Sequence, residues 1–406
     1  MHVLFIAPHF PQGQKQFVRS LCSVGARVTG IGEAAVDHLD HELKSWLHGY
    51  EQVPSVCDEN ALYQAVRRVQ KREWVDRLEA TIEAHILPAA RIREQTKIPG
   101  LSVKAAILCR DKPEMKAFFR AHQVPCAHST GASSADEAMA FAQKVGFPLI
   151  VKPRQGAGAS GTERVDNAGE LTAALAHMGV GRGASVALEE FITGHEGFYD
   201  TLTINGQIGH EFICHYYPNV LEAMRTRWIS PQIVVTNRMD EPGYDELKVL
   251  GRRVISALGL ATTATHMEWF FGPKGLRFSE IGARPPGVSH WDLYCAANDF
   301  DLYREWAHAI VHGRIDNRPS RRYSAGIIAL RPDRDGTIVG YDGADEIDNR
   351  FGEFIVDAHL PPAGTPTQPV EAGYMANAWV RMRHPDYDVL REMLDTVGRV
   401  MQVRAG

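Results

Sequence analysis

Two apolar runs separated by a short turn, Met267–Phe271 and Leu276–Ile281, constrain the fold of this chain more than any other stretch. The residues GPKG between the runs predict a β-hairpin. Side chains alternate between the faces of a strand, so the hairpin sets Glu268 opposite Glu280 or one diagonal step away. Like charges directly opposite each other destabilise a sheet. The pair therefore predicts a divalent cation, unless both carboxylates are simply solvated on an exposed hairpin.

His266 and Arg284 are each expected to share a strand face with one of these two glutamates. His266 shares the face of Glu268, and Arg284 shares that of Glu280 if the second strand continues. Pro285 to Gly287 stiffens the backbone after Arg284, whose planar guanidinium group suits a carboxylate or a phosphate. We interpret His266 as a core or supporting histidine rather than a metal ligand.

The bulk composition excludes several classes of protein. The chain has 406 residues, which at roughly 150 residues per domain predicts two or three domains. Its net charge of −5 and the absence of a basic run argue against nucleic-acid or membrane partners. Six scattered cysteines without a CxxC pair indicate reduced thiols in a cytoplasmic protein. The sequence predicts no signal peptide, and no apolar run approaches the ~20 residues that span a bilayer.

A strand that ends in a lysine precedes a glycine-rich loop. The segment 147–153 (FPLIVKP) carries Lys152, which is costly to bury without an anion, although a lysine at a strand end can also reach solvent. The loop GAGASG from Gly156 to Gly161 matches GxGxxG by letter. A dinucleotide-binding fingerprint opens directly into a helix, whereas TERVDN predicts a strand and a turn. The glycines therefore predict a flap between antiparallel strands that covers phosphates, or else a plain surface loop.

Two further segments supply nucleotide-binding chemistry. The strand 186–192 (VALEEFI) offers backbone donors and acceptors beside Phe191 and Ile192, as an adenine requires, and Glu196 can accept ribose hydroxyls. An ordinary exposed strand edge is the alternative. Lys112 begins a predicted helix over 112–121 that Asp111 caps, and a plain helix-start lysine is equally compatible with the pattern.

The order of elements predicts an α/β and α+β chain in three parts. The strand–loop–helix–strand order at the start is the first half of a doubly wound α/β domain, assigned to residues 1–106. Residues 63–95 are predicted to be helical with a break at Pro88. Residues 107–318 hold the motifs above, and residues 319–406 form a small α+β region.

These motifs, in this order, resemble the ATP-grasp family of carboxylate–amine or carboxylate–thiol ligases, in the branch that includes biotin carboxylase and purine-biosynthesis enzymes. The resemblance implies a Rossmann-like amino-terminal domain, an ATP-grasp domain with a mobile lid at about 126–185, and a small carboxy-terminal domain. It implies ATP contacts from Lys112, Lys152, the flap (Gly156, Ala157, Gly158, Ala159, Ser160, Gly161), the adenine segment (Glu189, Glu190, Phe191, Ile192) and Glu196. It further implies Mg²⁺ on Glu268 and Glu280, an acyl phosphate on Arg284 with Lys152 as its catalytic partner, and substrate near Arg284, Gly287 and His290.

Two departures refine the resemblance. Gly282 stands where many members have an asparagine metal ligand, so one magnesium ion is expected and a second is left open. The segment after Arg284 reads PPGVSH rather than a QVEH-type motif, which argues against biotin carboxylase itself. The EIGARPPG segment with HMEW before it is closer to ligases that join amino acids.

The resemblance implies an enzyme that activates a small carboxylate as an acyl phosphate, joins it to an amine, and releases ADP and phosphate. A purine-pathway-like enzyme that uses formate or bicarbonate and a non-catalytic ATP-binding protein are the alternatives. An NAD(P)-dependent oxidoreductase is disfavoured because residues 179–183 lack the acidic residue it needs. Arg225 and Arg227 are expected on a solvated face, and a homodimer is common among similar proteins.

Overall fold

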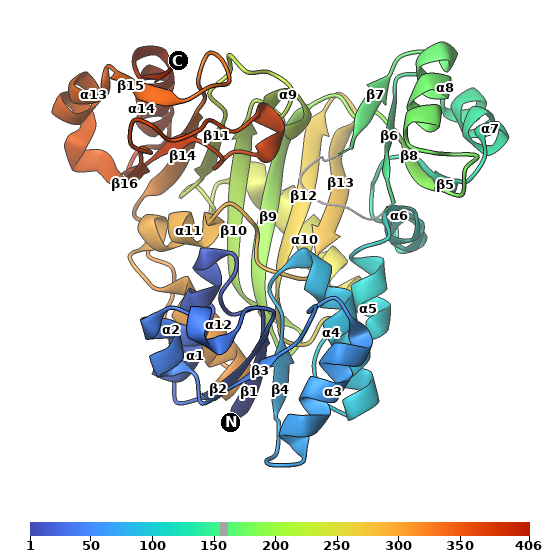
Figure 1. Cartoon of the computed structure of the whole chain (residues 1–406). Helices are drawn as coiled ribbons and strands as arrows, with labels where there is room; N and C mark the ends of the chain where they lie inside the picture. Colours follow the sequence, from blue (N-terminus) through green and yellow to red (C-terminus); the bar gives the residue numbers. More distant parts are fainter. Residues whose placement is uncertain (155–160) are drawn as a thin grey trace.

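The computed structural model describes residues 1–154 and 161–406. The predicted flap residues 156–160 thus lie outside the described residues. Figure 1 shows a central sheet with three regions around it: the amino-terminal unit (blue) below, the lid region (126–185, green) at one upper corner and the tail (orange to red) at the other. The mixed α/β and α+β fold expected from the sequence is confirmed.

The amino-terminal unit is a parallel four-stranded sheet in the order β3-β2-β1-β4, covered by helices. Parallel strands need crossover connections, and a helix follows each of the first two strands here. The strands are β1 His2–Ile6, β2 Arg27–Gly32, β3 Gly49–Gln52 and β4 Arg77–Glu79, and the helices are α1 Lys15–Ser23, α2 His41–Trp46, α3 Glu59–Gln70, α4 Glu83–Thr96 and α5 Val103–Leu108.

The predicted helix over 63–95 with a break at Pro88 is wrong in two respects. Strand β4 divides this stretch into α3 and α4, and α4 continues through Pro88 without a break. Strand β4 has three residues, too few for an alternating pattern to register against the helical pattern on either side.

The lid region is a second, antiparallel sheet in the order β5-β8-β6-β7, reached through helix α6 (Lys112–Ala121). Strand β6 pairs antiparallel with β7 through Leu149↔Val165 and Val151↔Glu163. A strand therefore follows Gly161, as predicted, and the dinucleotide-binding alternative is excluded. The elements are β5 Ser129–Ala132, α7 Ala135–Val145, β6 Leu149–Pro153, β7 Glu163–Val165, α8 Ala168–His177 and β8 Val186–Glu190.

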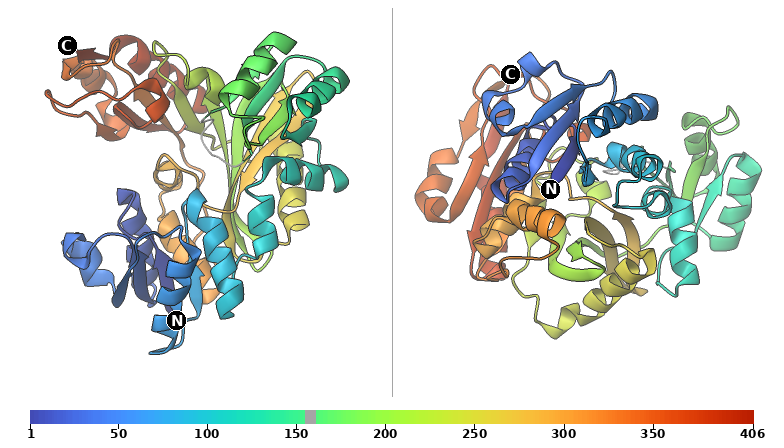
Figure 2. Two further views of the ribbon diagram at one scale, coloured as in Figure 1. Left: turned by 45° about the vertical axis from the view of Figure 1, so that its right-hand side comes forward. Right: turned by 90° about the horizontal axis from the view of Figure 1, so that it is seen from below.

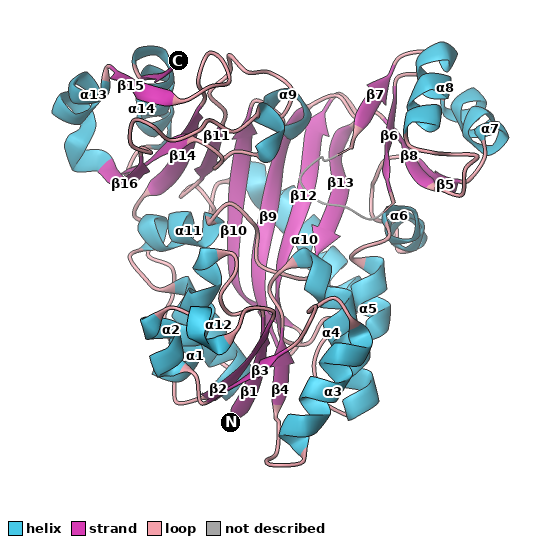
Figure 3. Ribbon diagram, viewed as in Figure 1, coloured by secondary structure: helices cyan, strands magenta, loops and turns pink. Residues whose placement is uncertain are grey.

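An eight-stranded antiparallel sheet forms the centre, in the order β13-β12-β9-β10-β11-β14-β17-β16 (Figure 3). The predicted hairpin is β12 with β13, and a bulge between Met267 and Trp269 leaves Glu268 outside the regular pairing with β13, while Glu268 pairs with Phe198 of β9 on its other side. The strands before the tail are β9 His195–Ile204, β10 Gln207–Tyr217, β11 Gln232–Val235, β12 Thr263–Gly272 and β13 Gly275–Gly282, and the helices are α9 Val220–Ala223, α10 Asp245–Leu258, α11 His290–Asn298 and α12 Leu302–His312.

The tail continues the central sheet with β14, β17 and β16, and adds a separate two-stranded sheet of β15 and β18. Strand β14 pairs with β11, so the sheet runs across the proposed boundary at residue 319. The tail contains β14 Ser324–Leu330, β15 Ile338–Asp342, α13 Ala344–Phe351, β16 Ile355–His359, β17 Ala378–His384, α14 Tyr387–Val400 and β18 Gln402–Ala405. Short 3-10 helices lie at η1 Gln12–Gln14, η2 Val36–His38, η3 Pro242–Tyr244, η4 Gly352–Phe354 and η5 Val370–Ala372.

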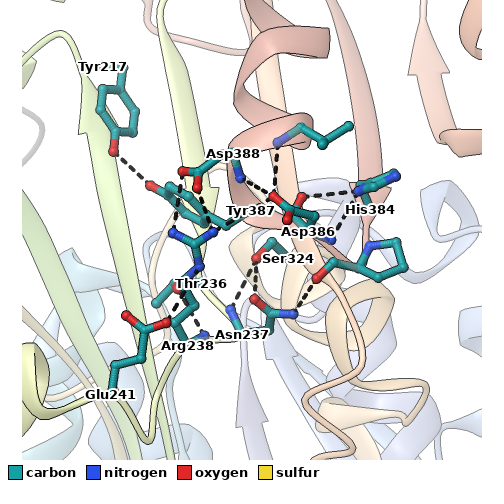
Figure 4. Close-up of polar contacts among 12 residues, drawn as sticks. Tyr217, Thr236, Asn237, Arg238, Glu241, Ser324, His384, Asp386, Tyr387 and Asp388 are labelled. Atoms are coloured by element: carbon teal, nitrogen blue, oxygen red, sulfur yellow. Dashed lines mark hydrogen bonds and ion pairs between the residues drawn. The ribbon is translucent and has the colours of Figure 1, made fainter.

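A polar cluster fastens the start of α14 to the segment after β11 (Figure 4). Arg238 lies 2.7 Å from Asp388 and 3.7 Å from Asp386. Tyr387 and Tyr217 share a hydrogen bond of 2.7 Å. These contacts hold the tail helix against the sheet that carries the hairpin.

Aromatic packing joins the amino-terminal unit to the helices that follow the hairpin. The ring of Phe17 on α1 lies 5.1 Å from Trp306, 5.0 Å from Tyr303 and 5.1 Å from Trp291. Figure 2 shows α12 (orange) among the blue helices of the unit. Within the described ranges, no helix has the length and apolar character to cross a bilayer.

Gly251 lets α10 pack on the sheet. A Cβ atom at this position would lie 2.3 Å from the ring of Tyr199, which is fully buried. We expect Gly251→Ala to lower the free energy of unfolding by about 1–3 kcal/mol, because the packed core has no room for the methyl group. Urea unfolding measures the change. Gly243→Ala is the control, since its Cβ meets nothing within 4 Å, and equal effects of the two variants would contradict the packing argument.

Candidate active site

A cavity of about 480 Å³ lies between the lid region, the hairpin and the segment around α9. Charged side chains and apolar side chains both line it, as a nucleotide with its phosphates and base requires. Nine of the predicted site residues line this cavity: Lys112, Lys152, Glu189, Glu190, Phe191, Ile192, Glu196, Glu268 and Glu280. Segments far apart in the sequence thus meet in one place.

The buried Lys116 and the partly buried Lys152 share one glutamate in the wall of the cavity. The Nζ atoms of Lys116 and Lys152 lie 2.8 and 2.9 Å from Glu189. Burial raises the pKa of Glu189, but the two ammonium groups outweigh it and hold the pKa at about 2. Glu189 is therefore a carboxylate. Lys116, whose pKa is lowered by burial and partly restored by Glu189, is a cavity residue that the sequence did not reveal. Its spacing of four from Lys112 on one helix was the signal that could have found it.

Lys112 and Lys152 also approach the hairpin. They lie 3.4 and 3.9 Å from Glu280. Burial raises the pKa of Glu280, and the nearby lysines outweigh that effect and lower it. The hairpin carboxylate and the lysine cluster are thus one electrostatic unit.

Glu196, a third carboxyl group of the cavity, has a raised pKa instead of a lowered one. Glu196 is buried, and it accepts a hydrogen bond of 2.7 Å from the backbone N–H of Val220. Burial, and then the charge of Glu268, raise its pKa to about 8. Negative charge around Glu268 is therefore incompletely neutralised by the protein.

This surplus of negative charge fits a divalent cation. Within the described ranges, no group of three or more His, Cys, Asp or Glu side chains is placed to hold a metal by itself. Mg²⁺ is usually held by one or two carboxylates together with substrate phosphates and water. Glu268 and Glu280, both lining the cavity, match that donor set.

His266 lies between Asp200 and Glu268. Its Nδ1 atom lies 2.8 Å from Asp200 and its Nε2 atom 3.7 Å from Glu268. Burial lowers its pKa, but Asp200 outweighs burial and the pKa rises to about 9. Tyr294 donates a hydrogen bond of 2.5 Å to the other oxygen of Asp200. His266 is thus a charged link in a chain that orients Glu268.

In the segment 189–192, the two carboxylates have protein partners and the backbone and apolar side chains do not depend on those ion pairs. The carboxylates of Glu189 and Glu190 are engaged, with Lys116 and Lys152 for the first and Lys274 for the second. What this segment can offer a base is its backbone and the Phe191 and Ile192 side chains. The guanidinium group of Arg164 lies 4.5 Å from the ring centre of Phe191.

The predicted substrate residues are only partly brought together. Arg284 lies beside a second cavity of about 20 Å³, which Lys112 and Glu280 also line. Gly287 and His290 line neither described cavity, because α11 begins at His290 and that side chain turns into the core, where its Nδ1 atom contacts the carbonyl of Gly287.

The two arginines expected on a solvated face differ from each other. Arg225 is exposed and lines the large cavity, and it donates a hydrogen bond of 2.5 Å to the carbonyl of Thr162 in the lid region. Arg227 pairs with Asp335 in the tail at 2.6 Å. Arg225 thus belongs to the cavity wall, and Arg227 does not.

Comparisons with known proteins agree with this geometry. Residues 117–300 match the family model of the ATP-grasp domain. The chain is 25% identical over 248 residues to the L-arginine-specific L-amino acid ligase of Bacillus subtilis, covering 60% of this chain and 59% of that protein. It is 28% identical over 240 residues to the formate-dependent phosphoribosylglycinamide formyltransferase of a Synechococcus species, covering 58% of each.

A solved structure extends the likeness to the whole fold. The L-amino acid ligase of Bacillus licheniformis superposes with a TM-score of 0.78 at 19% identity, over 100% of this chain and 98% of that one. In sequence, the chain spans less than two thirds of the curated relatives it matches. The chain contains an ATP-grasp domain, and the resemblance found in its sequence is confirmed at that level.

The shared glutamate of the lysine cluster tests the electrostatic unit. We expect Glu189→Gln to cost about 3–5 kcal/mol of unfolding free energy, because it leaves two lysines without their buried partner. Denaturant unfolding at pH 7 measures this. The neighbouring Glu190→Gln is the control, since its partner Lys274 is exposed and such pairs contribute less than about 1 kcal/mol. A loss at Glu189 no larger than at Glu190 would contradict the assignment.

The raised pKa of Glu196 predicts a pH-dependent stability. The folded protein keeps a proton on Glu196 up to about pH 8, whereas the unfolded chain loses it near the ordinary value of 4.5. Stability therefore falls as pH rises through that window. In EDTA, we expect Glu196→Gln to be more stable than the unchanged protein at pH 8.5 and similar to it at pH 5. The exposed neighbour Glu222→Gln is the control, and a gain independent of pH would be the contrary result.

Proposed function

We propose that this protein is an ADP-forming carboxylate–amine ligase. The observation that carries the proposal is the placement of Lys112, Lys116 and Lys152 against Glu268 and Glu280 in one nucleotide-sized cavity. Such a set neutralises the phosphates of ATP from both sides, with lysines and with a metal ion on the carboxylates. The ATP-grasp domain match supports the choice of nucleotide.

The reaction has two displacements. A carboxylate oxygen attacks the γ-phosphorus of ATP, a new O–P bond forms, the bond to the ADP oxygen breaks, and an acyl phosphate results. The amine nitrogen then attacks the acyl carbon, the C–O bond to phosphate breaks, and a proton leaves the nitrogen. Neither step needs a covalent bond to the protein, whose task is to position the reactants and balance their charge.

Each part of the site has a role in this scheme. Lys112 and Lys152 would bind phosphate oxygens, and Glu189 holds Lys152 in place. Glu268 and Glu280 would hold Mg²⁺, which when bound supplies positive charge to the transferring phosphoryl group. Arg284, beside the small cavity at Glu280, would bind the substrate carboxylate and its acyl phosphate. Backbone and apolar groups of the 189–192 segment would hold adenine.

The substrate class we propose is the amino acid, as both donor of the carboxylate and donor of the amine. Two of the compared proteins bear the name of L-amino acid ligase, and the formate-dependent relative marks the alternative. We also propose a cytoplasmic location, in keeping with six cysteines that are all free thiols, and a homodimer, which size-exclusion chromatography with light scattering tests.

ADP release measures the proposed activity. We expect ADP from Mg-ATP with at least one pair of amino acids, and a dipeptide in the same reaction by mass spectrometry. Glu280→Ala should lower the rate by roughly 10²-fold or more, because the phosphoryl group loses its metal. Formate and bicarbonate with amine acceptors complete the panel.

The control is Glu346→Ala, an exposed glutamate of α13 in a surface pair with Arg350. Unchanged ADP release in Glu280→Ala would refute the metal assignment. ATP binding without ADP release for every pair would favour the non-catalytic alternative instead.

A further inference from the structure

A glutamate of the amino-terminal unit reaches the hairpin arginine. Glu83, the first residue of α4, accepts a hydrogen bond of 2.6 Å at Oε2 from Nε of Arg284. The two side chains are only 20% and 15% exposed. A charge-assisted bond of this length between partly buried groups is among the stronger hydrogen bonds in proteins. It joins two parts of the chain 201 residues apart.

Glu83 is itself held in place. Nη1 of Arg110 donates to the backbone carbonyl of Glu83 at 2.7 Å and to its Oε1 at 3.2 Å. Each carboxylate oxygen of Glu83 therefore has its own guanidinium partner. The aromatic contacts of Phe17 with the helices after the hairpin fix the rest of the amino-terminal unit.

These contacts leave one end of Arg284 available. Nε donates to Glu83, and Nη1 donates to the carbonyl of Pro285 at 2.9 Å. In the part of the chain that the structure describes, no protein acceptor contacts Nη2. The same guanidinium group lines the small cavity with Lys112 and Glu280, which also line the large one.

Gly282 makes the space for this pair. A Cβ atom on Gly282 would lie 3.1 Å from Oε2 of Glu83, and 3.5 and 3.6 Å from Cγ and Nε of Arg284. The first distance is tighter than an ordinary van der Waals contact. A side chain at this position would therefore press on the hydrogen bond that fixes Arg284.

We propose that Glu83 is a positioning residue that aims Arg284 at the acceptor carboxylate, and that Gly282 is the space this arrangement needs. The inference rests on the proposed ligase function and adds to it. The amino-terminal unit contributes to the chemistry through one carboxylate that touches no substrate. Glu83 holds the guanidinium group through Nε, beside the small cavity that Arg284 lines with Lys112 and Glu280.

Steady-state kinetics with the full-length protein tests the proposal. We expect Glu83→Gln to raise the KM for the carboxylate substrate, or to lower kcat, by about tenfold or more, while the KM for ATP stays within about twofold. Gly282→Ala should change the same parameter in the same direction. Glu59→Gln is the matched control, since Glu59 pairs with Arg91 on the same unit away from the cavities.

A double-mutant cycle separates positioning from a general loss of stability. If Glu83 acts through Arg284, adding Glu83→Gln to Arg284→Gln costs no further activity. A further loss equal to that of Glu83→Gln alone would overturn the proposal, as would an equal rise in the KM for ATP. Gly282→Ala gives a second reading if Glu83→Gln unfolds.

Different outcomes refute the proposed function and the positioning role of Glu83. If the unchanged protein forms no ADP with any substrate pair, the proposed function falls, and the positioning role falls with it. If it forms ADP and Glu83→Gln and Gly282→Ala behave like Glu59→Gln, only the positioning role is refuted.

Discussion

The sharing of the buried Glu189 carboxylate by the buried Lys116 and the partly buried Lys152 is the interaction on which this site depends. Lys116 comes from α6, Lys152 from the end of β6 and Glu189 from β8, so three elements must be in place before any of the charges is balanced. Burying an unpaired charge is costly, and a buried pair that loses one partner is worse than none. The cluster therefore ties the lysine side of the cavity to the correct assembly of the lid region on α6.

The carboxylates of the hairpin side of the cavity differ in how closely positive groups approach them. Glu280 lies within reach of two lysines, whereas Glu268 and Glu196 face each other with less compensation. His266, charged through Asp200, balances part of that side. The cavity thus has a part around Glu189 and Glu280 that lysines compensate, and a part around Glu268 and Glu196 where negative charge is less compensated. Under the proposed function, the lysines would face the phosphates and the cation would lie on the side of Glu268.

The sequence predicted the parts of the site that have local signatures. The hairpin, the strand ending in Lys152, the antiparallel partner after Gly161 and the start of α6 all follow from period, turns and caps. It did not predict Asp200, Lys116 or Glu83, because a residue that acts through a partner far along the chain looks ordinary in its own segment. It also misjudged β4, which is too short to show a period. The substrate role of His290 stays a prediction, and its side chain lies buried at the start of α11. The continuity of the central sheet into the tail is likewise a matter of pairing between distant strands.

The packing of α12 on α1 bears on how the chain acquires its structure during synthesis. The amino-terminal sheet has its strands and crossover helices within the first hundred residues, yet Phe5 and Phe17 share a core with Trp306 and Tyr303. That side of the unit stays exposed on the ribosome until two hundred further residues have emerged. The first part of the chain to be made is therefore among the last to be completed, because α12 can cover it only after the segment that carries Glu268 and Glu280 has been synthesised.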